Sequence, residues 1–179
     1  FALTGLLLPL LEATPGARVV TTTSGAAFIG RIDFADLMGE RDYSRWGAYA
    51  QSKLANILFA NALQRRFAAA GTEASAHSAH PGLVYTNLQR NAAMVSTSPL
   101  ERFFHGTFTP LAGQDAAMGA LPMVHAALSG KAQGGDLWAP RLLMARGRPA
   151  LLQQPRAARD QETQERLWRL SEELTGVEY

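Results

Sequence analysis

Apolar and polar positions follow two different patterns along this chain. Apolar side chains recur at helical spacing in four segments: 1–13, 48–70, 111–128 and 158–174. Three shorter runs are nearly continuous in β-branched or small residues, which is typical of buried strands: 17–24, 73–82 and 134–140. The last helix is the most amphipathic, since Leu167, Leu170 and Leu174 recur at i, i+3 and i+7.

Turn and loop residues separate these elements. Thr14-Pro15-Gly16 ends the first helix, Gly71 follows the second, and Pro81-Gly82 closes the second strand. We expect a mixed loop over 25–47 and an irregular segment over 83–109 with one short helix near Pro99–Gly106. Helices of 12–22 residues that alternate with short apolar strands predict an α/β layer structure, in which helices cover both faces of a parallel sheet.

Length and composition narrow the class of protein. The 179 residues fit a single domain, 1–179, with 47% hydrophobic and 18% charged residues, as expected of a globular fold. The net charge of +2 is too small to indicate a nucleic-acid-binding protein. The chain has no cysteine, which excludes disulfides, thiolate metal sites and cysteine nucleophiles and suits a reducing cytoplasm. We assign no metal site.

Fifteen of the seventeen basic residues are arginines, and five of them form a loose group. The members of this group are Arg141, Arg146, Arg148, Arg156 and Arg159. We expect a solvated face or loop there rather than a site for a polyanion.

The longest apolar stretch, residues 1–11, is about half the ~20 residues that a membrane span requires. It also lacks the charged leader and small-residue cleavage site of a signal peptide. The chain begins abruptly inside this helix-like run, with no capping residue before it. We therefore expect that the natural beginning of the protein is missing.

Tyr49 and Lys53 are the first candidates for chemistry. At i and i+4 they share one face of the 48–70 helix, one turn apart. An ammonium near a phenol favours the phenolate, and a tyrosine so tuned can act as a general acid or base toward an alcohol or a carbonyl. The alternative, a surface tyrosine beside a solvated lysine, stays open for the pair alone.

Ser24 follows the strand 17–24, at the edge of the sheet where open α/β folds place their ligands. Its hydroxyl could donate a hydrogen bond to a substrate oxygen, although a Ser-Gly pair after a strand also forms plain turns. No G-x-S-x-G motif is present, so a hydrolase triad has no support.

The stretch His80-Pro81-Gly82-Leu83-Val84-Tyr85-Thr86 forms a rigid turn after the second strand. Its exposed backbone groups and the Thr86 hydroxyl could grip a ligand that carries an amide, or form an ordinary loop. We expect structural rather than catalytic roles for His80 and His105.

Together, "TTTSGAAFIG", "YAQSK" and "HPGLVYT" occur in a fixed order that resembles the short-chain dehydrogenase/reductase family. The insertion 31–49, the helix sequence "AYAQSKLANILFANAL" and the tail "RLWRLSEELTGV" are similar to the retinol-dehydrogenase-like members. The resemblance covers essentially the whole chain. It implies the C-terminal part of a Rossmann-like, doubly wound parallel sheet and an NAD(P)-dependent oxidoreductase that interconverts an alcohol and a carbonyl.

The resemblance also implies roles for individual residues. Ser24 would hydrogen-bond the substrate oxygen, and Tyr49 would be the proton donor or acceptor. Lys53 would favour the phenolate and bind the ribose hydroxyls of the nicotinamide half, and Tyr49 would also belong to the cofactor-binding residues. The cofactor's carboxamide would be held by the Val84 backbone and Thr86, positioned by the turn Pro81–Gly82.

The cofactor and substrate are expectations of the same kind. NADP is the first choice of cofactor and NAD the second. The substrate would be a lipophilic alcohol, aldehyde or ketone, and residues 87–110 would form the substrate loop. Met94, Phe103, Phe104 and Phe108 could line its pocket or pack within the loop. A homodimer through the 48–70 helix is a further expectation.

The first half of the family pattern is absent from this sequence. There is no G-x-x-x-G-x-G loop, no Asn-Asn-Ala-Gly segment and no asparagine on the helix that begins at Phe1. These parts bind the adenosine and pyrophosphate and complete the proton relay. Only three candidate strands remain, and we expect the strand at 18–24 to present an unpaired edge.

We therefore expect the isolated chain neither to bind a dinucleotide tightly nor to turn over substrate. The alternative to an enzyme is a catalytically inactive truncated fragment, or a binding remnant of the same fold.

Overall fold

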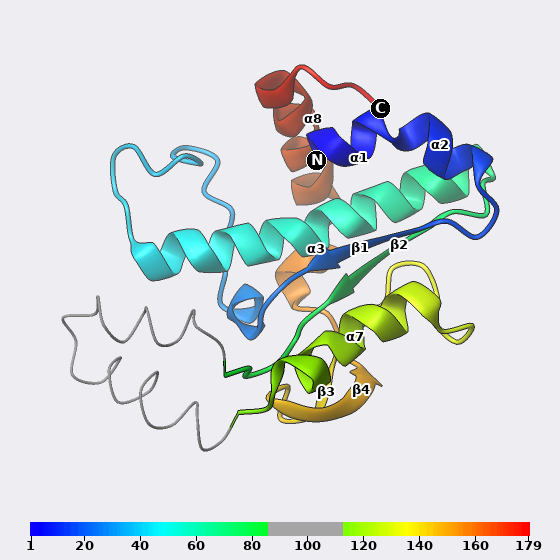
Figure 1. Cartoon of the computed structure of the whole chain (residues 1–179). Helices are drawn as coiled ribbons and strands as arrows, with labels where there is room; N and C mark the ends of the chain where they lie inside the picture. Colours follow the sequence, from blue (N-terminus) through cyan, green and yellow to red (C-terminus); the bar gives the residue numbers. More distant parts are fainter. Residues whose placement is uncertain (86–112) are drawn as a thin grey trace.

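A four-stranded sheet organises the chain (Figure 1). The computed structural model describes residues 1–85 and 113–179. The strands are β1 (Arg18–Thr22), β2 (Ser75–Ala79), β3 (Leu137–Leu142) and β4 (Arg146–Leu151). They lie in the order β1-β2-β3-β4, with β1, β2 and β3 parallel and β4 antiparallel to β3.

The helices alternate with the strands along the chain. The α-helices are α1 (Ala2–Leu6), α2 (Leu8–Ala13), α3 (Arg45–Ala70), α7 (Ala116–Leu128) and α8 (Gln161–Thr175). Two 3-10 turns, η1 (Gly25–Phe28) and η3 (Arg156–Arg159), complete the set among the described residues. In Figure 1, α3 and α7 lie on opposite sides of the sheet, and α8 lies against α3. The predicted α/β class with helices on both faces of a mostly parallel sheet is confirmed.

Side-chain caps explain where the long helices begin. Ser44 accepts a hydrogen bond from the Gly47 N–H, Asp115 from Met118 and Asp160 from Thr163, each at the N-cap of its helix. At its other end, α3 stops at Gly71, which has a left-handed φ of 67°. The cap at Ser44 places the start of α3 three residues before the predicted residue 48.

Two apolar clusters hold α3 in place. The first joins Leu54, Ile57 and Leu58 of α3 to Leu137 of β3 and Leu167 of α8. The second contains Leu63 and Phe67 of α3, Ala76 of β2 and Trp168 of α8. Because α3 contributes to both clusters, burial of its apolar face is the main hydrophobic driving force that fixes the helix on the sheet.

Trp168 anchors α8 to α3. Its ring is 3% exposed, stacks on Phe59 at 5.7 Å between centroids, and carries the Arg66 guanidinium over its face at 3.7 Å. Glu165 accepts hydrogen bonds from Arg65 at 2.6 Å and from Arg66 at 2.8 Å. These contacts fasten the C-terminal helix along the outer side of α3.

The sequence pattern missed one strand. β4 was not predicted, because Arg146, Gly147, Arg148 and Pro149 disfavour a strand in the centre of a sheet. β4 lies at an edge, pairs with β3 alone among the described residues and turns back on it, which is where proline and arginine are tolerated in a sheet.

Other boundaries moved by a few residues. The predicted helix 1–13 divides at Leu7, where Pro9 sits in the first turn of the second piece. The predicted strands 73–82 and 134–140 become Ser75–Ala79 and Leu137–Leu142, and the helix over 111–128 begins at Ala116. Leu174 was expected on the buried face of the last helix and is 59% exposed. The short helix expected near residues 99–106 lies outside the described residues.

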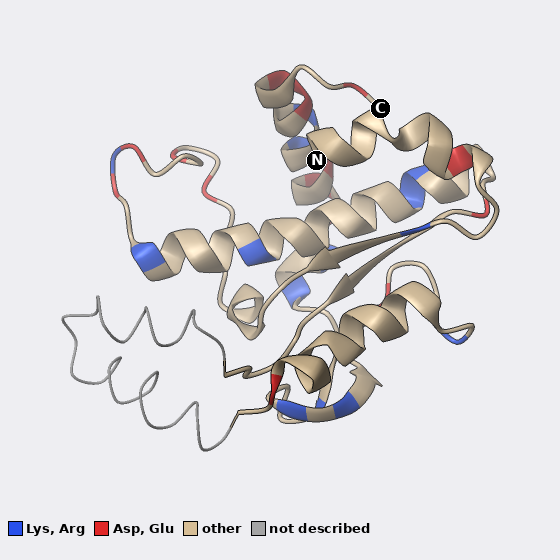
Figure 2. Cartoon of the chain, in the orientation of Figure 1, with Lys and Arg blue, Asp and Glu red and all other residues tan. Residues whose placement is uncertain are grey.

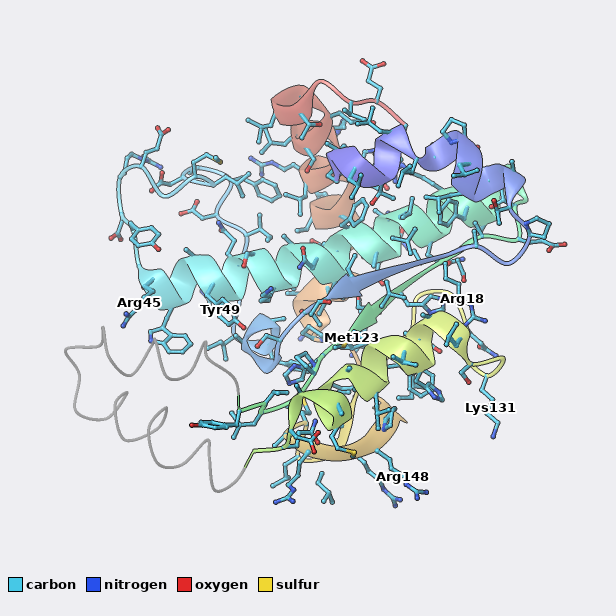
Figure 3. The ribbon with its side chains drawn as sticks, viewed as in Figure 1. Arg18, Arg45, Tyr49, Met123, Lys131 and Arg148 are labelled. Carbon is cyan, nitrogen blue, oxygen red and sulfur yellow. The ribbon has the colours of Figure 1, made fainter. Side chains whose placement is uncertain are left out.

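β1 forms an edge of the sheet, as predicted. Within the part of the chain that the structure describes, β2 is its one strand partner. The Arg18 side chain, labelled in Figure 3, crosses from β1 to α7. Its guanidinium donates to the carbonyl oxygens of Ala126 and Ser129 at 2.9 and 2.8 Å, so a cation caps the C-terminal end of that helix.

Acidic and basic residues are distributed over most elements of the fold, with several basic residues on the β3–β4 hairpin (Figure 2). All five arginines of the group 141–159 are exposed, as expected of a solvated surface. None of the helices within residues 1–85 and 113–179 combines the length and apolar character needed to cross a bilayer.

Candidate active site

Three successive threonines join the end of β1 to α3. Thr21 donates from its hydroxyl to the Asn56 carbonyl at 3.1 Å, and the Asn56 amide donates to the Thr22 carbonyl at 2.8 Å. The hydroxyl of the buried Thr23 donates to the Lys53 carbonyl at 2.7 Å. These bonds fix the helix at Lys53 against the carboxyl end of the strand.

Tyr49 and Lys53 lie one turn apart on α3, as the spacing predicts. The Lys53 ammonium nitrogen is 5.6 Å from the centroid of the Tyr49 ring, which is the distance of a cation–π contact. Tyr49 is 39% exposed, and Trp46 packs edge-on against its ring at 6.1 Å. Figure 3 labels Tyr49 and Arg45 in the first turns of α3. The Tyr49 ring is therefore partly exposed and contacts both Trp46 and Lys53.

Ser24 follows β1 directly and caps η1. Its Oγ accepts a hydrogen bond from the Ala26 N–H at 3.3 Å. The residues on either side of Ser24 lie close to the other two motifs, at Lys53 and at His80. Thr23 bonds to Lys53, while a Cβ added to Gly25 would lie 3.5 Å from Nε2 of His80. The serine thus sits between α3 and the segment that leaves β2.

The turn after β2 passes close to the β3–β4 hairpin. Gly82 has a φ of 80°, and a Cβ at this position would lie 2.4 Å from the Ala145 carbonyl oxygen. The next residue, Leu83, donates its N–H to that same oxygen at 2.7 Å. Glycine is required here both by the backbone conformation and by the close approach.

Gln114 holds this turn in place. Its backbone N–H donates to Leu83 at 2.8 Å and its carbonyl accepts from Tyr85 at 3.0 Å, which makes a parallel bridge to Val84. Its side-chain amide donates to the Pro81 carbonyl at 2.9 Å and accepts from the Gly147 N–H at 2.8 Å. Every polar group of this buried residue is used.

The bridge to Gln114 does not use the backbone groups of Val84 itself. The bonds on either side of it run through Leu83 and Tyr85, so the Val84 N–H and C=O point the other way. Neither group bonds to another described residue. Its side chain packs against α7, where a Cβ on Gly119 would lie 2.4 Å from Cγ2 of Val84. A donor and an acceptor on one residue are the complement of an amide.

His80 lies between the serine and the turn and is 8% exposed. Its Nδ1 accepts the Gly82 N–H at 3.3 Å. Burial lowers the pKa of His80 from its ordinary value of 6.5 to about 4. The imidazole ring is therefore neutral at physiological pH. It packs between the serine and the turn, which agrees with the structural role expected for it.

The loop before α3 is a small unit of its own. The Asp36 carboxylate accepts the N–H groups of Glu40, Arg41 and Asp42, and the bond from Asp42 is the largest cause that lowers the pKa of Asp36. Gln51 fastens the loop to α3, because its side chain accepts from the Asp33 N–H and donates to the Leu37 carbonyl. A hollow of about 310 Å³ lies between this loop and α3, and Ser24, Tyr49 and Lys53 do not line it.

Most of the residues selected from the sequence meet at one end of the sheet. Ser24 follows the end of β1, and the Lys53 carbonyl is bonded to Thr23 beside it, with Tyr49 one turn before Lys53 on α3. The Pro81–Gly82 turn with Val84 follows the end of β2. Thr86 lies outside the described residues, as do His105 and the apolar residues Met94, Phe103, Phe104 and Phe108 of the predicted substrate loop.

Sequence patterns did not single out Thr23 and Gln114. Thr23 is one of three adjacent threonines, and only burial separates it from Thr22. Gln114 lies inside the helix predicted over 111–128, whereas α7 begins only at Ala116, and its partners, Pro81 and Gly147, are 33 residues away on either side.

Comparisons with known proteins agree with this geometry. Polyprenol dehydrogenase of Mus musculus is 40% identical over 181 residues, an alignment that covers 99% of this chain and 51% of that protein. Retinol dehydrogenase 12 of Homo sapiens is 37% identical over 179 residues, covering 100% of this chain and 52% of that protein. The chain thus spans about half the length of the curated relatives it matches, in their C-terminal portion.

A solved structure of an uncharacterized protein from Mycobacterium Paratuberculosis superposes with a TM-score of 0.72 at 36% identity. The superposition covers 99% of this chain and 55% of the mycobacterial chain. No family model matches the chain. The full-length coverage of this chain by dehydrogenases, together with the fold, shows that it belongs to the short-chain dehydrogenase/reductase family.

Proposed function

We propose that this chain is the acid–base half of an NAD(P)-dependent oxidoreductase that interconverts an alcohol and a carbonyl. The observation that carries the proposal is the placement of Lys53 beside Tyr49, 5.6 Å from its ring, on a helix that Thr23 fixes at the end of β1 next to Ser24. The dehydrogenase names of the relatives support the same class of reaction.

Each side chain has a defined task in this proposal. For carbonyl reduction, the Tyr49 hydroxyl donates its proton to the substrate oxygen, and the Ser24 hydroxyl donates a hydrogen bond to the same oxygen. In the reverse direction, the Tyr49 phenolate takes the proton of the alcohol. The Lys53 ammonium stabilises that phenolate because it is an opposite charge one helical turn away.

The residues present fit a nicotinamide cofactor. The N–H and C=O of Val84, which bond to no described residue, match the oxygen and the amide hydrogens of a carboxamide, and Gln114 holds the turn that presents them. Lys53 and Thr86 complete the proposed binding set with Pro81 and Gly82. When bound, the cofactor supplies or accepts the hydride, and the chain's own residues handle the proton and the orientation.

We propose a lipophilic alcohol, aldehyde or ketone as the substrate. The relatives are named for retinol and polyprenol, both long apolar alcohols. NADP remains our first choice of cofactor and NAD the second. Cytoplasmic location and a homodimer are also proposals. α8 already packs along α3, so a dimer through α3 would use the face that α8 leaves open.

We further propose that the 179-residue chain is inactive by itself. The chain spans half the length of its relatives and contains no glycine-rich phosphate loop. The free edge of β1 among the described residues also favours the alternative, a non-catalytic remnant of the fold. Titration of the isolated chain with NADPH and NADH, followed by nucleotide fluorescence, tests this point. Micromolar binding of either nucleotide would contradict it.

Turnover by the full-length natural protein tests the proposed reaction. Tyr49→Phe should abolish the reduction of a lipophilic aldehyde, followed by loss of NADPH absorbance, while cofactor binding is largely retained. Tyr43→Phe is the matched control, because Tyr43 is 68% exposed on the loop before α3. Turnover that survives in Tyr49→Phe would remove Tyr49 from the mechanism, and loss in Tyr43→Phe would show that the assay reports on folding.

A further inference from the structure

The hairpin between β3 and β4 ends in a turn with two large apolar side chains on the outside. Leu143 is 93% exposed and Leu142 is 58% exposed. The turn closes with the Ala145 N–H on the Leu142 carbonyl at 2.8 Å. Two adjacent large apolar side chains this exposed at a loop tip are unusual on the surface of a soluble protein.

The backbone conformation of this turn is also unfavourable for leucine and methionine. Leu143 and Met144 occupy its two central positions with φ of 51° and 58°, so both lie in the left-handed region. Hairpins with this geometry strongly prefer Asn-Gly, because other side chains adopt it at a cost. A sequence that accepts this cost in order to place Leu and Met at the tip points to a use for the apolar tip.

Positive charge surrounds the tip. Arg141, Arg146 and Arg148 flank it, all three are exposed, and none has an ion pair or side-chain hydrogen bond to another described residue. The sequence has no acidic residue between Asp136 and Asp160. Asp115, the N-cap residue of α7, uses its carboxylate to accept the Met118 N–H. In Figure 3, Arg148 lies at the outer side of the hairpin.

We propose that the β3–β4 tip is a docking surface for an anionic lipid bilayer. Leucines that enter the interface between headgroups and acyl chains, ringed by arginines that contact anionic headgroups, match the charge and polarity of that interface. The hairpin lies at the opposite edge of the sheet from β1, so strands that extended the sheet beyond β1 would leave it uncovered.

The β3–β4 tip is directly connected to the candidate active site. Ala145, in this turn, accepts the Leu83 N–H at 2.7 Å, which joins the tip to the turn that carries Val84. A docked tip therefore holds that end of the site at the bilayer surface, where a lipid-soluble substrate is dissolved. The docking itself does not depend on the proposed reaction and can be measured without turnover.

Co-sedimentation of the 179-residue chain with vesicles tests the proposal. We expect binding to vesicles of phosphatidylcholine mixed with an equal part of phosphatidylglycerol, and much weaker binding to phosphatidylcholine alone. Each arginine near an anionic surface contributes about 1 kcal/mol, or about fivefold. The triple variant Arg141→Gln, Arg146→Gln, Arg148→Gln should therefore weaken binding by on the order of 100-fold.

A second variant separates docking from folding. Leu143→Asn with Met144→Gly gives the turn its preferred residues, so the chain should be at least as stable to heat while it loses vesicle binding. Leu3→Ser with Leu6→Ser is the matched control, because both leucines are exposed on α1, on the opposite side of the molecule (Figure 1).

Three results would overturn the proposal. They are vesicle binding that survives in Leu143→Asn/Met144→Gly, binding lost in the α1 control instead, or equal binding to neutral and anionic vesicles. Tight binding of heparin or duplex DNA in the absence of vesicles, lost in the arginine variant and unchanged in the leucine variant, would instead assign the arginines to a soluble polyanion.

Discussion

The hydroxyl of Thr23 donates a hydrogen bond of 2.7 Å to the backbone carbonyl of Lys53. The bond joins the residue before Ser24 to the residue one turn after Tyr49. It therefore sets the distance between the two parts of the sequence that carry the proposed acid–base chemistry. Because Thr23 is buried and its hydroxyl is bonded to the Lys53 carbonyl, we propose that it acts as a positioning residue.

Thr23→Val tests that role. Valine keeps the branched shape but cannot donate, so we expect a loss of about 1 kcal/mol in the free energy of unfolding, measured with urea. In the full-length protein, kcat should fall more than the KM for the cofactor changes. Thr22→Val is the control, since Thr22 is exposed and is joined to α3 through its backbone carbonyl, which accepts the Asn56 amide. An equal effect of the two variants would rule out a special role for Thr23.

Gln114→Leu removes the side-chain amide that joins the turn after β2 to the hairpin. It leaves the Pro81 carbonyl and the Gly147 N–H without their partner, and we expect a loss of about 2–3 kcal/mol in unfolding free energy. Gln153→Leu, at an exposed position, should change stability by less than about 0.5 kcal/mol. Urea titration of both variants checks the difference. Two similar curves would mean that water replaces the amide at little cost.

His80 predicts a loss of stability in mild acid. Its pKa is about 4 in the folded chain and 6.5 ordinarily, so the unfolded chain binds the proton first as the pH falls. The contribution is complete above pH 6.5 and is lost as the pH falls toward 4, about 2 kcal/mol of it between pH 7 and pH 5.

His80→Asn isolates this effect, because asparagine can still accept the Gly82 N–H and does not titrate. Burial also lowers the pKa of His77, but His77 is present in both proteins and its effect cancels in the comparison. Unfolding free energies at several pH values should give a flatter profile for the variant. Parallel profiles would assign the acid sensitivity to other groups.

Trp168→Ala should detach α8 from α3. The buried indole packs on Phe59 and under the Arg66 guanidinium, and we expect a loss of about 3–5 kcal/mol. Leu174→Ala, at a 59% exposed position of the same helix, should cost less than about 0.5 kcal/mol. Thermal unfolding followed by circular dichroism distinguishes the two. A Trp168→Ala protein with unchanged stability would show that α8 adds little to the fold.

Local patterns predicted the α/β class and the main helices, because their apolar positions keep one period over many residues. The same patterns could not predict β4. Arg146, Gly147 and Pro149 have low strand propensity. This segment is a strand because it pairs in antiparallel fashion with β3, which the local sequence does not indicate. Leu174 continues the apolar stripe of the last helix, yet it is 59% exposed at the end of that helix.

The residues of the candidate site also fall into two groups, those that the sequence predicted and those that only the structure revealed. Tyr49, Lys53 and Ser24 were predicted because their residue types and spacing indicate acid–base chemistry. Thr23 and Gln114 act through contacts that form only when distant segments fold together, so no local pattern separates them from other threonines and glutamines. Their roles could be seen only from burial and from the partners of each polar group.

The contact of Arg18 with the end of α7 has a consequence for how the fold opens. The last turn of a helix usually frays, because its carbonyl groups lack partners. Here the Ala126 and Ser129 carbonyls depend on a side chain from a strand more than 100 residues earlier. The amide hydrogens in this turn should therefore exchange with solvent only when β1 also separates from the sheet, as one cooperative unit.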